Sequence, residues 1–280
     1  AAIAAPDVAV ITNVGTAHIE FMKTREAIAL EKGMLAEAVS AEGCVVLNAA
    51  DAFTPSLTGR AKASVIAAGI GRGQVRAENL KQRGDGSSFD IVFEGGTFPV
   101  ELPMPGEHMV ANATLAIAVG LHAGVAPEAI VAGLAGVAIT GGRLQFRKVN
   151  GLSFIDDSYN ANPDSMRAAL ATMRTIDCAG KRVAVLGRMA ELGDGSKAAH
   201  YELGKVAASE FYIDAVFTVG EEAAEITRGF ADAGGRYSHP FATHDECRES
   251  IESLNPEDLI LVKGSRSSAM ENVIPKSYTS

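Results

Sequence analysis

The sequence predicts an α/β protein with a mostly parallel sheet in its second half, and three observations support this fold class. Short runs of β-branched residues alternate with helical patterns along the whole chain. Several of these runs are apolar without interruption, which is typical of strands buried on both faces of a parallel sheet. The length of 280 residues exceeds the ~100–200 residues of one domain, so we expect two domains.

The first half is expected to alternate strands and helices and then to change to antiparallel hairpins. The expected elements are strands at 7–12, 44–49 and 63–69, helices at about 24–39 and 108–123, and a shorter helix after Pro127. Thr24 is a plausible N-cap for the first helix. Between residues 74 and 103, alternating segments are broken by Gly84-Asp85-Gly86 and Gly95-Gly96, which indicates hairpins.

The second half repeats the alternation of strands and helices and predicts a doubly wound, mostly parallel sheet. Strands are expected at 152–156, 182–187, 215–220 and 259–264, with helices beginning near Pro163, Ser196, Glu221, His244 and Ser267. In such folds ligands bind at the carboxyl ends of the strands. We therefore expect a site formed by residues 156–162, 187–193 and 263–266, and a hinge at Gly141-Gly142.

Composition excludes several classes of partner. The net charge of −9, from 25 Lys and Arg against 34 Asp and Glu, repels nucleic acid and anionic membranes. The longest apolar stretches fall short of the ~18 residues of a membrane span. Three widely separated cysteines without metal spacing fit a reducing cytoplasm, and we expect a cytoplasmic monomer.

Three features of the first half have both a chemical and a structural interpretation. His18, in a polar cluster that follows the first strand, is either a metal ligand or a loop residue. Lys32 lies on a helix, where a lysine usually faces solvent; it would bind Mg²⁺ only after CO₂ converts its amine to a carbamate. Asn112, one turn into a helix, either contacts a nucleotide base or faces solvent.

Three motifs of the second half follow strands directly. DDSYNANP at 156–163 concentrates polar groups at one strand-to-helix turn, where Asp157 is suited to a ribose hydroxyl and Asn162 to capping the helix. GRMAELG at 187–193 is either a site loop or a simple turn. In LVKGSRSSAME at 261–271, Lys263 and Arg266 with neighbouring hydroxyls predict an anion site.

Two nucleotide-binding motifs are absent from the sequence. No segment has the P-loop pattern G-x-x-x-x-G-K-[ST], and the near match at Gly69-Ile-Gly71-Arg-Gly73 lacks the third glycine of G-x-G-x-x-G. The second absence argues against a nicotinamide dehydrogenase.

Taken in order, the three motifs of the second half resemble those of the Mur ligases, most closely the MurF branch, and the similarity extends over about residues 7–274. The resemblance implies that residues 1–141 are the later part of a central ATPase domain and that 142–280 form a Rossmann-like C-terminal domain that brings in the amine substrate. It implies an ATP- and Mg²⁺-dependent ligase that joins D-alanyl-D-alanine to UDP-N-acetylmuramoyl-tripeptide through an acyl phosphate, in peptidoglycan synthesis.

The resemblance also implies residue roles. His18 and Lys32, the latter carbamylated, match metal-binding residues at the catalytic centre, and Asn112, Arg143 and Asp157 match nucleotide contacts. The residues expected on the amine-substrate side are Tyr159, Asn160, Asn162, Lys263, Ser265 and Arg266. Met109 and Arg188 depart from the family pattern, where asparagine and aspartate are usual.

Two further expectations concern the extent of the chain and its alternatives. The chain has neither an initiator methionine nor a P-loop, so we expect it to be part of a longer enzyme and not to hydrolyse ATP by itself. The alternatives are another Mur-type amino-acid ligase, or a non-catalytic nucleotide- or sugar-binding module.

Overall fold

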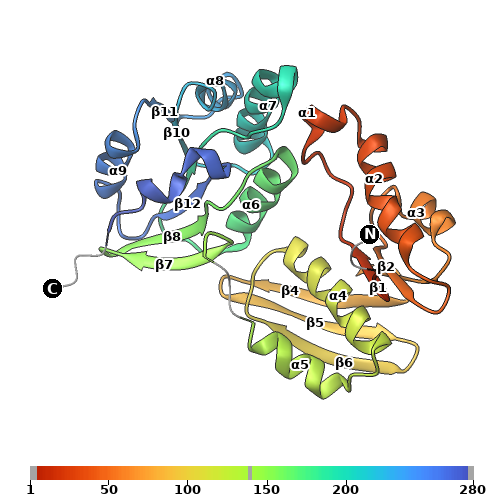
Figure 1. The fold of residues 1–280 in the computed structure, drawn as a ribbon. Coiled ribbons are helices and arrows are strands. Elements are labelled where there is room, and N and C mark those ends of the chain that lie inside the picture. The colour runs from red at the N-terminus through yellow and green to blue at the C-terminus, as the bar shows by residue number, and fades with distance from the viewer. Residues whose placement is uncertain (1–4, 138–140, 277–280) are drawn as a thin grey trace. The chain divides into compact units, whose positions relative to one another are not determined.

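The computed structural model describes residues 5–137 and 141–276, which form two compact units (Figure 1). Unit 1 contains residues 5–15 and 22–137, and unit 2 contains residues 16–21 and 141–276. Each unit has a six-stranded, mostly parallel sheet with helices packed against it. The predicted α/β fold class is confirmed. The predicted domain boundary after Gly141 stays a prediction, because residues 138–140 lie outside the described residues.

Unit 1 contains one sheet with strand order β1-β2-β3-β4-β5-β6. Its strands are β1 Val8–Ile11, β2 Cys44–Asn48, β3 Ser64–Ile70, β4 Val75–Arg83, β5 Gly86–Phe93 and β6 Gly96–Leu102; its helices are α2 Arg25–Ala38, α3 Thr54–Arg60, α4 Glu107–His122 and α5 Pro127–Ala135. The first four strands pair in parallel, and β4, β5 and β6 form the two predicted antiparallel hairpins.

The apolar positions of α2 and α4 determine how these helices pack. On α4, Val110 and Ile117 are buried in a core cluster with Val46 and Ile91 of the sheet. Helix α2 begins after Thr24, whose hydroxyl accepts a hydrogen bond from the backbone N–H of Ala27 at 3.1 Å. This helix buries Ile28, Ala29, Gly33 and Ala36. Lys32 is consequently half-buried at the edge of the buried face.

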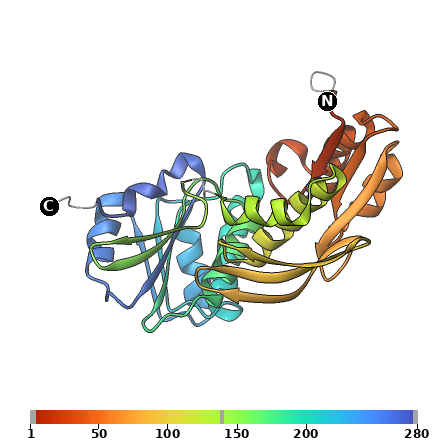
Figure 2. The ribbon, with the colours of Figure 1, turned by 90° about the horizontal axis from the view of Figure 1, so that it is seen from below.

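Unit 2 contains a sheet with strand order β11-β10-β9-β12-β8-β7, and helices lie on both sides of it (Figures 1 and 2). Its strands are β7 Gln145–Val149, β8 Leu152–Asp157, β9 Arg182–Leu186, β10 Ala215–Val219, β11 Tyr237–Phe241 and β12 Leu259–Lys263. Its helices are α6 Pro163–Thr175, α7 Ser196–Ser209, α8 Ala224–Asp232 and α9 His244–Glu252, with 3₁₀ turns η1 Gly193–Gly195, η2 Arg266–Ser268 and η3 Met270–Val273. The short helix α1, Ile19–Met22, begins in the segment 16–21.

The register of the central strands brings the three motifs together. Strand β12 lies between β8 and β9 and is parallel to both, with Lys263 opposite Asp157 on one side and Leu186 on the other. The carboxyl ends of β8, β9 and β12 are therefore neighbours at one edge of the sheet. This is the edge at which the sequence predicts a ligand site.

Three local expectations differ from the structure. From Ser267 to the last described residue, 276, the chain forms no α-helix; two 3₁₀ turns are separated there by Ala269, whose φ of 45° interrupts a right-handed helix. The helix expected near Glu221 begins at Ala224. Edge strands β7 and β11 were not predicted, and β11 contains Pro240, which is tolerated at a sheet edge but weakens the sequence signal.

Among the residues that the structure describes, no helix is long and apolar enough to cross a membrane.

Candidate active site

The turn after β8 is organised by two adjacent carboxylates, one buried and one partly exposed, that have different partners. Asp156 is 3% exposed and accepts hydrogen bonds from the backbone N–H and hydroxyl of Ser158, the latter at 2.6 Å. Asp157 accepts a hydrogen bond from the N–H of Leu144 at 3.1 Å and forms an ion pair with Lys263 at 2.6 Å. The adjacent acids therefore fix the turn from opposite sides of the strand.

Lys263 lies beneath this turn rather than at its surface. Its side chain is 3% exposed, and its ammonium also donates to the carbonyl oxygen of Asn160 at 2.8 Å. Burial lowers the pKa of Lys263, and the charge and hydrogen bond of Asp157 oppose this shift. The ion pair thus holds the backbone of the DDSYNANP turn in place.

The polar residues that follow serve both the local structure and the surface. The Asn162 side chain caps α6 by accepting from the N–H of Ser165, whose hydroxyl accepts in return from the N–H of Asn162. Asn160 is exposed. Tyr159 is 45% exposed, and the centre of its ring lies 4.2 Å from the guanidinium carbon of Arg143, close enough for a cation–π interaction.

The LVKGSRSSAME loop is held by the GRMAELG loop beside it. The N–H of Ser265 donates to the carbonyl oxygen of Arg188 at 2.9 Å. Arg266 is 64% exposed at its side chain and pairs with Glu271 at 2.7 Å. The side chain of Arg188 pairs with Glu222 at 2.8 Å. The charge of Arg188 is therefore compensated locally.

A buried histidine fixes the GRMAELG loop from below. His200 is fully buried, and its Nε2 accepts a hydrogen bond from the backbone N–H of Met189 at 2.8 Å. Its Nδ1 lies 2.7 Å from the carbonyl oxygen of Ser196, so Nδ1 carries the proton and donates. Burial lowers the pKa of His200. Protonation of Nε2 would break the bond to Met189.

We expect unit 2 to lose stability as the pH falls below about 6.5, the value at which His200 takes up a proton in the unfolded chain. The pKa of His200 is lower in the folded protein than in the unfolded chain. The free energy of unfolding therefore falls as the pH drops from the unfolded-state pKa toward the folded-state pKa, by at most about 1.4 kcal/mol for each pH unit. His200→Gln, whose amide oxygen can still accept from Met189, should weaken this dependence. The check is urea denaturation at several pH values, with the exposed His122→Gln as control.

Loops from three strand ends surround a cavity of about 500 Å³ in unit 2. Six predicted site residues line it: His18, Tyr159, Asn160, Asn162, Ser265 and Arg266; the other lining residues are Ala17, Ala161, Ala190, Glu191 and Ser267. Arg143 stacks on Tyr159 at this site, while Asp157 and Lys263 support it from beneath. Glu191 was not among the predicted site residues. Its position in the GRMAELG motif was the available signal.

Two predicted site residues, Lys32 and Asn112, belong to unit 1. The ammonium of Lys32 donates to the backbone oxygen of Asn13 at 2.6 Å. Burial lowers the pKa of Lys32, and the charge of Asp51 opposes this shift. Asn112 is exposed on α4. The lowered pKa favours an uncharged amine, which is the form of lysine that reacts with CO₂.

The donor set is compatible with Mg²⁺ if substrate supplies further ligands. Among the described residues, no group of three or more His, Cys, Asp and Glu side chains could hold a metal ion. Mg²⁺ is commonly bound through one or two protein ligands, with substrate phosphates and water completing its coordination. His18 of unit 2 and, once converted to a carbamate, Lys32 of unit 1 each offer a single ligand of this kind.

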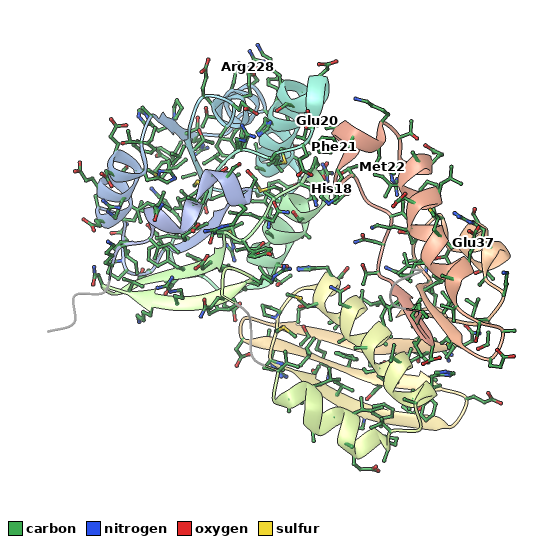
Figure 3. The ribbon with its side chains drawn as sticks, in the orientation of Figure 1. His18, Glu20, Phe21, Met22, Glu37 and Arg228 are labelled. Atoms are coloured by element: carbon green, nitrogen blue, oxygen red, sulfur yellow. The ribbon has the colours of Figure 1, made fainter. Side chains whose placement is uncertain are left out.

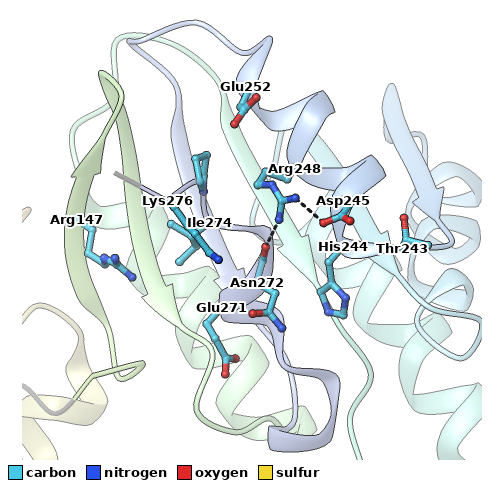
Figure 4. Close-up of a pocket in the computed structure, with 11 residues that line it drawn as sticks. Arg147, Thr243, His244, Asp245, Arg248, Glu252, Glu271, Asn272, Ile274 and Lys276 are labelled. Carbon is cyan, nitrogen blue, oxygen red and sulfur yellow. Dashed lines mark hydrogen bonds and ion pairs between the residues drawn. The ribbon is translucent and has the colours of Figure 1, made fainter. Parts of the chain in front are cut away.

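A second groove of unit 2, about 820 Å³ in volume, contains none of the predicted site residues (Figure 4). It is lined mainly by polar and charged side chains, most of them from α9 and η3. Several of these charges are already paired: Arg248 contacts Asp245 and the carbonyl oxygen of Asn272, and Glu271 pairs with Arg266. The smaller cavity, where six predicted residues converge, is therefore the better candidate active site.

The fold and its motifs place the chain in a known class of enzymes. Residues 1–120 match the family model of the Mur ligase middle domain, and residues 142–266 match that of the Mur ligase glutamate ligase domain. The chain belongs to the Mur ligase family. ATP dependence is general in this family.

Several of the similar proteins belong to one branch of the family, the MurF ligases. The UDP-N-acetylmuramoyl-tripeptide–D-alanyl-D-alanine ligases of Bacillus subtilis and Escherichia coli are 35% and 33% identical, over 97% and 96% of this chain. MurF from Acinetobacter baumannii superimposes with a TM-score of 0.87 at 34% identity, and MurF from Thermotoga maritima in complex with ADP with 0.83 at 25%, each over 97% of this chain. The chain spans 59% of the two curated relatives and 59% and 61% of the two solved chains.

Proposed function

We propose that the protein containing this chain is an ATP-dependent ligase that joins D-alanyl-D-alanine to UDP-N-acetylmuramoyl-tripeptide in the cytoplasm. The observation that supports this most directly is the convergence of three motif loops on one cavity in unit 2. The names of the relatives, which share about a third of their residues with the chain, indicate the two substrates. Three free cysteines are compatible with a reducing compartment.

The proposed reaction has two steps. An oxygen of the tripeptide's terminal carboxylate attacks the γ-phosphorus of ATP, and the bond between this phosphorus and the oxygen that bridges it to the β-phosphate breaks. The products of this step are an acyl phosphate and ADP. The amino group of D-alanyl-D-alanine then attacks the acyl carbon, the amine loses a proton, and inorganic phosphate leaves. Phosphoryl transfer depends mainly on positioning and charge neutralisation, which a bound Mg²⁺ supplies.

The cavity side chains are suited to a small dipeptide. Arg266 presents an exposed guanidinium, which binds a carboxylate in bidentate fashion. Asn160, Asn162 and Ser265 offer amide and hydroxyl groups at the same cavity, and Tyr159 offers an aromatic face. We assign these residues to the amine substrate, with Lys263 as a positioning residue beneath them.

The remaining predicted residues are assigned to the nucleotide and metal. Arg143 is assigned to phosphate, Asp157 to ribose and Asn112 to adenine; a carboxylate offers about four acceptor sites, so Asp157 can contact ribose while bonded to Lys263 and Leu144. Lys32, as its carbamate, and His18 are assigned to Mg²⁺. None of these assignments requires a residue outside the described part of the chain.

Amine-dependent phosphate release tests the proposal. We would restore the region preceding residue 1, supply ATP, Mg²⁺ and UDP-N-acetylmuramoyl-tripeptide, and compare D-alanyl-D-alanine with D-glutamate, L-lysine and diaminopimelate. We expect release with D-alanyl-D-alanine alone. Release with a different amine would retain the ligase reaction and change the branch. Absence of release with every amine would favour a non-catalytic binding module.

A further inference from the structure

The segment Thr16–Phe21, in which Figure 3 labels His18, Glu20 and Phe21, belongs to unit 2. Two acidic residues hold it there, Asp164 of α6 and Glu191 of the GRMAELG loop. Asp164, in the first turn of α6, accepts hydrogen bonds from the N–H and hydroxyl of Thr16 at 2.9 and 3.0 Å. Glu191 contacts the segment twice: its carboxylate is bonded to Nδ1 of His18, and its backbone oxygen accepts from the N–H of Glu20 at 3.0 Å. Four hydrogen bonds therefore fix the segment on both sides of His18.

Both partners of the central contact have an unusual backbone conformation. His18 has φ 63° and Glu191 has φ 62°. Residues other than glycine rarely adopt left-handed values, which cost roughly 1 kcal/mol or more and persist where surrounding contacts determine them. Here the contact between His18 and Glu191 joins two such residues, 173 positions apart in the sequence.

The geometry determines which imidazole nitrogen carries the proton. An ionised carboxylate accepts hydrogen bonds and cannot donate, so Glu191 requires the proton of a neutral His18 to be on Nδ1. Nε2 then has the lone pair. The His18 side chain is 67% exposed and lines the cavity, so Nε2 is accessible to a ligand.

We propose that Glu191 is the positioning residue of His18, and that it fixes the tautomer in which Nε2 is the metal-binding nitrogen. A metal-bound histidine characteristically donates its other N–H to a carboxylate, which orients the ring and increases its basicity. Asp164 assists by holding Thr16. The inference rests on the proposed function through the metal role of His18, and it assigns a task to the GRMAELG loop beyond lining the amine site.

The first test measures the tautomer without any ligase activity. Nitrogen-15 chemical shifts of the six histidines would be recorded above about pH 8, where an ordinary imidazole is neutral, with His18→Gln assigning the signals. We expect His18 to be in the Nδ1–H form in the unsubstituted chain and to shift toward the commoner mixture in Glu191→Ala. An unchanged His18 spectrum in Glu191→Ala would overturn the proposal.

The second test uses Mn²⁺ alone as the probe. The Mn²⁺ concentration that half-broadens the His18 signals should rise about tenfold or more in Glu191→Ala and less in Thr16→Val. Asp194→Ala, an exposed acid on the same loop, should leave it unchanged. Equal broadening of His18 in Glu191→Ala and the unsubstituted chain would contradict the positioning role.

The two measurements separate this inference from the proposed function. Absence of Mn²⁺ broadening at His18 in the unsubstituted chain would overturn its metal role and with it the positioning role of Glu191. An intact ligase reaction together with an unchanged tautomer in Glu191→Ala would instead leave the proposed function standing and overturn this inference alone.

Discussion

Replacing Asp157 by alanine is expected to lower the free energy of unfolding of unit 2 by about 3–5 kcal/mol, because the substitution leaves a buried ammonium without its counter-ion. The ammonium of Lys263, 3% exposed, would keep the carbonyl oxygen of Asn160 as its remaining close partner at 2.8 Å. The effect should exceed that of an exposed carboxylate, where most substitutions change stability by less than about 0.5 kcal/mol. Asp177→Ala, at an exposed position, is the matched control.

The sequence provides a selective probe for this measurement. The chain has no tryptophan, and its five tyrosines all lie at or after Tyr159. Tyrosine fluorescence during urea denaturation therefore reports on unit 2 and not on unit 1. The double variant Asp157→Ala/Lys263→Met removes both charges and should be more stable than Asp157→Ala alone. A double variant no more stable than Asp157→Ala would show that lost packing, and not the unpaired charge, dominates.

Much of unit 2 follows from local sequence patterns, but the pairing of Asp157 with Lys263 does not. Continuous apolar runs such as those of β9 and β12 identify buried parallel strands, and the rule for strand ends locates the site. The order in which strands pair is a long-range property. The insertion of β12 between β8 and β9 places Lys263 opposite Asp157, and Lys263 is buried there. The sequence alone suggested only that Lys263 contributes to an anion site.

The contact of His18 with Glu191 was beyond sequence reasoning for a similar reason. Each residue is recognisable as a polar group that follows a strand, but nothing in either local pattern indicates a partner 173 positions away. The left-handed conformations of both residues also run against their intrinsic preferences. Such departures from local consistency tend to occur where function imposes a geometry.

Replacing Lys32 by alanine is expected to reduce D-alanyl-D-alanine-dependent phosphate release by the complete enzyme at least ~10³-fold, since a metal ligand contributes several kcal/mol of charge stabilisation. Lys32→Arg should be equally inactive because guanidinium stays protonated and cannot form a carbamate. Lys32→Glu, which supplies a carboxylate from a shorter side chain, should retain more activity than either. The exposed Lys62→Ala is the control.

A direct test of the carbamate does not depend on turnover. The amine must be unprotonated to react with CO₂, and burial of Lys32 lowers its pKa and so increases that fraction. We expect ¹³C-labelled bicarbonate to give a carbamate carbon signal in this chain that Lys32→Ala removes and Lys62→Ala retains. Added acetate should partly restore the activity of Lys32→Ala but not of Lys32→Arg, whose side chain fills the space. Full activity of Lys32→Arg would show that a cation, and not a carbamate, is what the site requires.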